Sequence, residues 1–153
     1  MRVSLWQETR FLFCPLIINL FFSAVLCEKE AIVLMDFEVV TVVEPELVRL
    51  TATGSYSLEG VFDLLDHVKA EADKAARELV LIDTREVEGN MTEADRFFAG
   101  RRLAEAFGSR LKTAVLLPAY KITKLGEAVA VSRGARVLVT DSETEALNWL
   151  LAE

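Results

Sequence analysis

The spacing of hydrophobic residues changes several times along this chain, and each spacing predicts a different element. Val48, Leu50 and Ala52 alternate with polar or charged neighbours, which is typical of a strand with one buried face. Over Leu58–Ala72 the apolar residues lie three and four positions apart, as in an amphipathic helix. Leu79–Ile82 is continuously apolar, as expected for a strand that is covered on both faces. The pattern therefore predicts strands that alternate with helices.

Turn and capping residues set the limits of these elements, whose predicted order is ββαβαβαβα. Glu44-Pro45-Glu46 separates the first two strands and indicates a hairpin. The strands are expected at Phe37–Val43, Leu47–Thr53, Leu79–Ile82, Lys112–Leu117 and Ala135–Thr140, and the helices from Ser57 to Arg77, Thr92 to Gly108, Ile122 to Arg133 and Ser142 to Leu151. This order implies a single α/β domain with a mixed, mostly parallel sheet that is covered by helices.

The helix that begins at Thr92 carries the clearest local signal. Thr92 and Asp95 have the spacing of a capping box, as do Ser142 and Glu145 at the last helix. The expected buried side of the Thr92 helix comprises Ala94, Phe97, Gly100, Ala104 and Phe107. Arg101 projects onto the same side, where it either extends along its methylene groups to solvent, which we favour, or reaches a carboxylate. His67 falls opposite the apolar stripe of its helix, and we expect it to be solvated.

The first 34 residues differ in composition from the rest. Phe11–Cys27 contains no charged residue and includes both cysteines of the chain. Three interpretations remain open: a secretory signal, a membrane anchor through residues 11–27, or upstream sequence that precedes a true start at Met35. We favour the internal start, because the first predicted strand follows Met35 without a linker. We therefore predict a leader over residues 1–34 and a domain over residues 35–153. The domain is expected in the cytoplasm, unless the leader anchors or exports it.

Charge and motif content argue against several classes of function. The net charge of −7 disfavours binding to nucleic acid. One predicted helix has several arginines, but acidic residues surround them (Arg96, Arg101, Arg102 and Arg110 among Glu93, Asp95 and Glu105). There is no glycine-rich phosphate loop, and a single histidine supports no catalytic triad. No His, Cys, Asp and Glu residues have the spacing of a metal site. We predict neither catalytic residues nor a metal or cofactor.

Six short motifs follow one another in a particular order over residues 35–153. They are Gly54 after the second strand, Leu79–Asp83, Asp95-Arg96 with Gly100-Arg101-Arg102-Leu103-Ala104, Ala114–Pro118, Arg133-Gly134-Ala135 and the closing Asp141–Leu150. In this order they resemble the STAS domain of anti-sigma-factor antagonists, and more closely the SpoIIAA-like group of small bacterial proteins (STAS/SEC14-type). The resemblance implies a non-catalytic regulatory domain that binds a protein partner of undefined identity.

The resemblance also points to Thr92. In phospho-switch STAS domains, a serine preceded by Asp caps the corresponding helix, whereas this chain has Met91-Thr92. Thr92 is thus either a phospho-acceptor or a helix cap, and the loss of the acidic neighbour favours the cap. We predict an interaction face at this helix start and its neighbouring loops. It comprises Asp83, Thr84, Arg85, Asn90, Met91, Thr92, Tyr120 and Lys121.

An alternative function is a carrier or sensor of a small hydrophobic, lipid-like ligand in a cleft between helix and sheet. Its candidate lining is aromatic and comprises Phe62, Phe97, Phe98, Phe107 and Tyr120. Asp83 would lie at the end of a buried strand, where open α/β sheets usually bind ligands, or would only anchor its loop. The opening hairpin leaves a sheet edge at which a homodimer could form.

Overall fold

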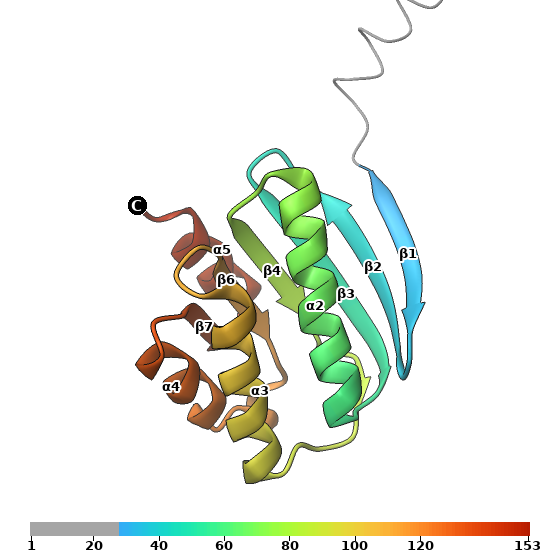
Figure 1. Ribbon diagram of the computed structural model, residues 1–153, viewed down its shortest axis with the longest axis vertical. Helices are drawn as coiled ribbons and strands as arrows, with labels where there is room; N and C mark the ends of the chain where they lie inside the picture. Colours follow the sequence, from blue (N-terminus) through green and yellow to red (C-terminus); the bar gives the residue numbers. More distant parts are fainter. Residues whose placement is uncertain (1–27) are drawn as a thin grey trace, which may run out of the picture.

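The computed structural model describes residues 28–153, which form a seven-stranded sheet with helices on both faces (Figure 1). The strands are β1 (Lys29–Leu34), β2 (Phe37–Val43), β3 (Leu47–Ser55), β4 (Leu79–Asp83), β5 (Val87–Glu88), β6 (Lys112–Leu116) and β7 (Arg136–Thr140). The helices are α2 (Leu58–Ala75), α3 (Glu93–Phe107), α4 (Leu125–Ser132) and α5 (Glu143–Leu151), with the 3-10 turn η1 (Ala119–Lys121). Residues 1–27, for which a signal, an anchor or untranslated upstream sequence was considered, lie outside the described part of the chain.

The sheet is antiparallel at its start and parallel thereafter, as predicted. The strand order is β1-β2-β3-β4-β6-β7, and β5 pairs with the end of β3. Strands β1, β2 and β3 are antiparallel neighbours, while the β3–β4, β4–β6 and β6–β7 pairs are parallel. The predicted hairpin is confirmed, since Val43 pairs with Val48 and the Glu44 N–H donates to the Leu47 carbonyl at 2.9 Å.

Strand β1 was not predicted, because Lys29–Leu34 was assigned to the leader. In the structure it pairs antiparallel with β2 along its whole length, from Lys29 opposite Val42 to Leu34 opposite Phe37. Met35 lies in the turn between the two strands, with a positive φ of 33°. Ile32 and Leu34 pack on the core, whereas Val33 is exposed, so β1 has the alternation of a half-buried strand. The long apolar run over residues 11–27 obscured this short pattern.

The two faces of the sheet have separate cores. Helices α2, α3 and α4 pack on one face and α5 packs on the other, against β4, β6 and β7. On β4, Val80 and Ile82 belong to the core under α2 and α3, whereas Leu81 belongs to the core under α5. The continuous apolar run of this strand is therefore explained by burial on both faces, as predicted.

The rotation of α3 about its axis differs from the prediction. The buried residues of α3 are Gly100, Leu103, Ala104 and Phe107, whereas Ala94 and Phe97 are exposed. Gly100 faces Gly126 of α4 so closely that a Cβ at position 100 would lie 2.3 Å from the Gly126 carbonyl oxygen. This contact turns Arg96, rather than Phe97, towards the sheet. Arg101 is exposed rather than on the buried side of α3, and it donates to Glu105 at 2.8 Å, so its side chain is in solvent and also reaches a carboxylate.

Three smaller differences concern the remaining helices. Helix α4 begins at Leu125 rather than Ile122, because Lys124 takes a left-handed conformation with φ of 60°. Ser142 caps α5 as predicted, but the carboxylate of Glu145 accepts a hydrogen bond from the Thr140 hydroxyl instead of completing a capping box. Leu151, expected to pack inward, is half exposed.

His67 is half-buried rather than solvated, and its Nε2 atom lies 3.4 Å from the hydroxyl of Thr41. Among residues 28–153, no helix has the length and apolar character that are needed to cross a membrane.

Candidate functional site

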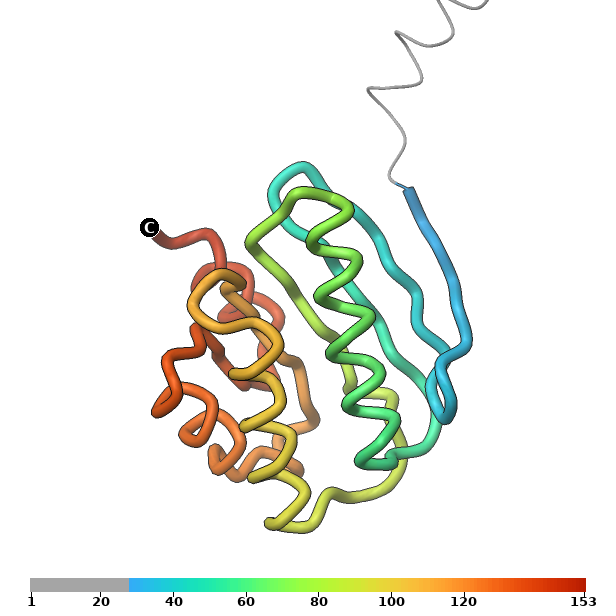
Figure 2. Tube along the Cα trace, in the orientation of Figure 1, coloured from blue at the N-terminus to red at the C-terminus, as the bar shows by residue number. Residues whose placement is uncertain are grey.

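A cavity of about 160 Å³ lies at the carboxyl ends of the parallel strands, beneath the first turns of α2 and α3. Figure 2 shows that the segment joining β4 to α3 runs along the end of the molecule at which both helices begin. The walls are mostly apolar and come from the sheet, the helices and the loops: Phe37, Val61, Leu64, Leu65, Ile82, Val87, Met91, Ala99, Leu103, Val115, Leu117, Ile122, Val137 and Val139. This is the position at which open α/β sheets bind ligands.

The alternation of strand residues decides which side chains reach the cavity. Ile82 and Thr84 face it, whereas Asp83 points to the opposite face of the sheet. The Thr84 hydroxyl donates to the carbonyl of Leu116 at 2.9 Å, which holds the end of β4 against β6. Leu117 continues β6 into the cavity wall. The cavity floor is thus set by the pleat of the parallel strands.

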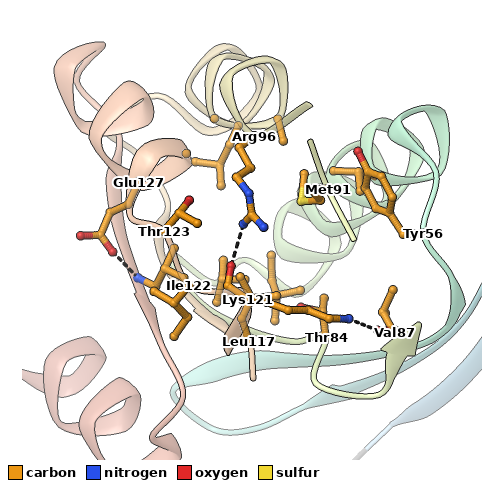
Figure 3. Close-up of a pocket in the computed structure, with 18 of the residues that line it drawn as sticks. Tyr56, Thr84, Val87, Met91, Arg96, Leu117, Lys121, Ile122, Thr123 and Glu127 are labelled. Atoms are coloured by element: carbon orange, nitrogen blue, oxygen red, sulfur yellow. Dashed lines mark hydrogen bonds between the residues drawn. The ribbon is translucent and has the colours of Figure 1, made fainter. Parts of the chain in front are cut away.

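Arg96 is the most prominent polar group of the cavity. It lies in the first turn of α3 and extends from the helix into the cavity, towards the loop that follows β6 (Figure 3). Its Nη1 atom donates to the carbonyl of Lys121 at 2.6 Å. Among the described residues, no carboxylate forms an ion pair with this guanidinium. Arg96 therefore brings a positive charge without an acidic partner to an apolar cavity.

Two lysines of the same loop complete the polar rim. Lys121 donates from its Nζ to the carbonyl of Val87 at 2.6 Å and forms no ion pair within residues 28–153. Lys124 pairs with Glu127 at 2.8 Å, and the same Glu127 oxygen also accepts the backbone N–H of Val139. Glu127 is the one acidic residue in the described lining, and its charge is matched by Lys124. The rim therefore keeps an excess of positive charge from Arg96 and Lys121.

Tyr56 contributes a further polar group. Its hydroxyl oxygen is enclosed, and the nearby Asp95 carboxylate is its acceptor. Burial raises the pKa of this phenol, and the negative charge of Asp95 adds to the effect. The hydroxyl consequently stays protonated at neutral pH and can donate a hydrogen bond.

The predicted interaction face is divided among three environments. Thr84, Met91 and Lys121 line the cavity. Asp83 and Arg85 lie on the α5 side of the sheet, away from the cavity, since Arg85 pairs with both Asp83 and Glu143 of α5. Asn90, Thr92 and Tyr120 are exposed, and Tyr120 retains 81% of its surface.

Asp83 belongs to a network of charges that holds loops together. Its carboxylate accepts from the backbone and the guanidinium of Arg85, with an Oδ2–Nη2 distance of 2.7 Å. Arg85 and Arg49 both reach Glu143 at the start of α5, and Arg49 also pairs with Glu44. Burial of the Asp83 carboxyl would raise its pKa, but the hydrogen bonds from Arg85 outweigh this and hold the pKa below its usual value. The geometry favours the loop-anchoring alternative for Asp83.

Thr92 caps α3 as predicted. Its hydroxyl accepts the Asp95 N–H at 3.1 Å, and the Asp95 carboxylate accepts the Thr92 N–H at 3.1 Å. This backbone hydrogen bond lowers the pKa of Asp95. The side chain of Thr92 is exposed, so the cap lies on the molecular surface.

None of the five aromatic residues that were expected to form an apolar pocket lines the cavity. Phe107 is buried in the core, and Phe62 is half-buried. Phe97, Phe98 and Tyr120 are exposed. Aliphatic side chains at the ends of the parallel strands take their place, because α3 turns its aromatic side outward. The sequence signal that identifies the correct lining is position after a parallel strand, as for Thr84 and Leu117, rather than aromatic character.

The exposed aromatic residues of α3 form a small surface patch. The rings of Phe97 and Phe98 meet edge to face, with centroids 5.6 Å apart. The guanidinium of Arg133 lies over Phe97, with 5.4 Å from its carbon to the ring centroid. Phe97 and Phe98 retain 38% and 43% of their surface. We call Thr92, Phe97 and Phe98 the α3 face.

Comparison with known proteins supports the fold. A crystal structure of an anti-sigma factor antagonist from Mycobacterium paratuberculosis is similar, with a TM-score of 0.54 and 10% sequence identity, over 76% of this chain and 95% of that chain. The anti-sigma factor antagonist SpoIIAA in its unphosphorylated form gives a TM-score of 0.41 and 15% identity, over 78% of this chain and 93% of that one. No protein-family model and no curated protein matches the chain. The STAS-like fold expected from the sequence is confirmed by the first of these structures.

Proposed function

We propose that this chain is a non-catalytic, STAS-like regulatory domain that binds a partner protein through the α3 face. The exposed Phe97–Phe98 pair, on the helix that Thr92 caps, is the observation that carries the proposal. Aromatic residues and arginine are enriched in protein interfaces, and Arg133 lies against Phe97. The similar structure from Mycobacterium paratuberculosis is described as an anti-sigma factor antagonist, which is consistent with regulation through a protein partner.

Thr92 has a defined part in this proposal. As a cap it fixes the start of the helix that presents both rings, and this does not require phosphorylation. A phosphoryl group on Thr92 would lie beside Glu93 and Asp95, whose negative charges would repel it. We therefore assign Thr92 the role of a cap at the start of the α3 face. A charge introduced there tests whether a partner contacts it.

The test compares variants of the full chain in affinity capture, with the captured protein identified by mass spectrometry and its affinity then measured. Phe98→Ala removes an exposed ring and is expected to weaken binding by about 1–2 kcal/mol. Thr92→Asp adds a charge to the face and should also weaken it. Leu151→Ala, an equally exposed apolar residue on α5, is the matched control and should bind as wild type. Unchanged affinity of Phe98→Ala and Thr92→Asp would show that the partner uses another surface.

The cavity favours a second candidate function, the binding of a small hydrophobic molecule. An apolar cavity of about 150 Å³ can hold benzene, whereas pockets for drug-sized ligands have volumes of about 300–1,000 Å³. The observed volume of about 160 Å³ therefore suits a small molecule and is too small to enclose a long lipid chain. Titration of the protein with toluene, followed by NMR, should shift the amide signals of Gly100 and Gly126. If millimolar toluene shifts neither signal, this second function is wrong.

A further inference from the structure

The charges at the cavity differ from those of the molecule as a whole. The chain has a net charge of −7, yet Arg96 and Lys121 both lie at the cavity without a carboxylate partner among the described residues. Placing a cation in apolar surroundings costs free energy unless an anion or hydrogen bonds compensate it. Backbone carbonyls supply one hydrogen bond to each of these cations, and the remaining N–H donors are left for another partner.

From this arrangement we infer that the cavity binds a small apolar molecule that carries one carboxylate, with the carboxylate held between Arg96 and Lys121. The inference rests on the second proposed function and names the class of its ligand. The volume of about 160 Å³ limits the apolar body to about six or seven non-hydrogen atoms, by comparison with cavities of about 150 Å³ that hold benzene. The aliphatic walls would contact this body, since Leu65, Ile82 and Val115 face the cavity.

A carboxylate fits these donors better than other charged groups. The planar guanidinium of Arg96 uses Nη1 for the Lys121 carbonyl, and its other N–H groups can bind two carboxylate oxygens side by side. Glu127 would not repel the ligand strongly, because Lys124 and the Val139 N–H already neutralise its oxygen. A cationic ligand would meet Arg96 and Lys121 and is excluded by repulsion.

Arg96 would link the bound ligand to the α3 face. Arg96 lies in the first turn of α3 and is the neighbour of Phe97. The same side chain holds the η1 loop through the Lys121 carbonyl. A carboxylate that draws Arg96 away from this carbonyl would loosen the η1 loop and free the side chain that precedes Phe97. Binding in the cavity is therefore placed where it can influence binding on the surface.

The experiment follows amide signals of the full chain by NMR during titration with benzoate, benzyl alcohol, benzylamine and inorganic phosphate. Benzoate and benzyl alcohol have nearly the same size and differ in charge. We expect benzoate to bind at least 10-fold more tightly than benzyl alcohol, and benzylamine and phosphate to leave the Gly89, Gly100 and Gly126 signals unchanged. This comparison uses the wild-type protein and does not depend on how any variant folds.

Variants of Arg96 and Arg101 then test which arginine of α3 binds the carboxylate. Arg96→Met should weaken benzoate binding by about 10-fold to 100-fold, the value of a hydrogen bond to a charged group, and leave benzyl alcohol unaffected. Arg96→Lys keeps the charge and should retain most of the affinity. Arg101→Met is the matched control, because Arg101 is exposed and pairs with Glu105 outside the cavity. It should bind benzoate as wild type does.

The possible results separate the inference from the function on which it rests. If benzoate and benzyl alcohol bind equally and Arg96→Met changes neither affinity, the claim that the ligand carries a carboxylate is wrong. The cavity would then bind neutral hydrophobic molecules. If phosphate binds as tightly as benzoate, the claim that the ligand needs an apolar body is wrong. If no probe shifts the three glycine signals at millimolar concentration, both the inference and the second proposed function are wrong.

Discussion

The contact between Gly100 and Gly126 fixes how α3 lies on the molecule, and its replacement gives a sharp prediction. In Gly100→Ala, the new Cβ would lie 2.3 Å from the Gly126 carbonyl oxygen and 3.0 Å from two further backbone atoms. A backbone carbonyl cannot rotate away as a side chain can. The two helices would have to move apart by about 1 Å to reach ordinary van der Waals contact.

The magnitude follows from two opposing terms. Alanine in place of glycine inside a helix stabilises it by about 1 kcal/mol. Overpacking of a close contact costs about 1–3 kcal/mol, and the short distance to rigid backbone places this site at the upper end. We therefore expect Gly100→Ala to lower the free energy of unfolding by about 2 kcal/mol, with a fall in Tm of about 6–10 °C.

Gly126→Ala is the matched control on the opposite helix. Its Cβ would lie 3.2 Å from the Arg96 carbonyl oxygen, which a shift of a few tenths of an ångström relieves. The gain in helix preference then offsets the strain, and we expect stability within about 0.5 kcal/mol of wild type. Urea unfolding of the wild type and the two variants measures both changes in unfolding free energy, provided that the slope with urea concentration (the m value) is the same for all three. A Gly100→Ala protein as stable as wild type would refute the close approach of α3 and α4.

Three further predictions concern the cap, the charge network and the two faces of the sheet. Thr92→Ala should lower the unfolding free energy by about 0.5–2 kcal/mol, measured by urea unfolding, because the Asp95 N–H loses its acceptor; no change would mean that the cap does not stabilise the fold. Asp83→Asn should cost about 1 kcal/mol at pH 7, since it removes the charged partner of Arg85. Because the folded-state pKa of Asp83 is lowered, the difference from wild type should be complete above the ordinary carboxyl pKa of about 4 and should disappear as the pH falls through the folded-state pKa. Urea midpoints of both proteins between pH 7 and pH 2 test this, and a difference that is as large at the lowest pH as at pH 7 would contradict it. Leu81→Ala should cost about 2–5 kcal/mol, whereas the half-exposed Leu151→Ala should change stability by less than about 0.5 kcal/mol; similar losses in the two variants, measured by thermal unfolding, would contradict the assignment of the core under α5.

Prediction of the site from the sequence succeeded where the signal was local. The Thr92–Asp95 capping box uses residues three positions apart, and the structure has both of its hydrogen bonds. Prediction of the cavity lining failed because it depends on residues from many elements. Phe97 and Phe98 looked suited to an apolar pocket, but the rotation of α3 places them on the surface. Arg96 was interpreted as part of a mixed-charge surface and instead reaches into the cavity.

The sequence by itself determined the main element order, the hairpin before β3, the burial of β4 on both faces and the cap of α3. These features follow from local preferences and from hydrophobic spacing, which act within a few residues. Only the tertiary structure showed that Lys29–Leu34 joins the sheet and that Asp83 and Thr84 face opposite sides of it. It also decided which side of α3 is buried. Positions 96 and 97 are both about one turn from Gly100, and the contact of that glycine with another helix selects between them.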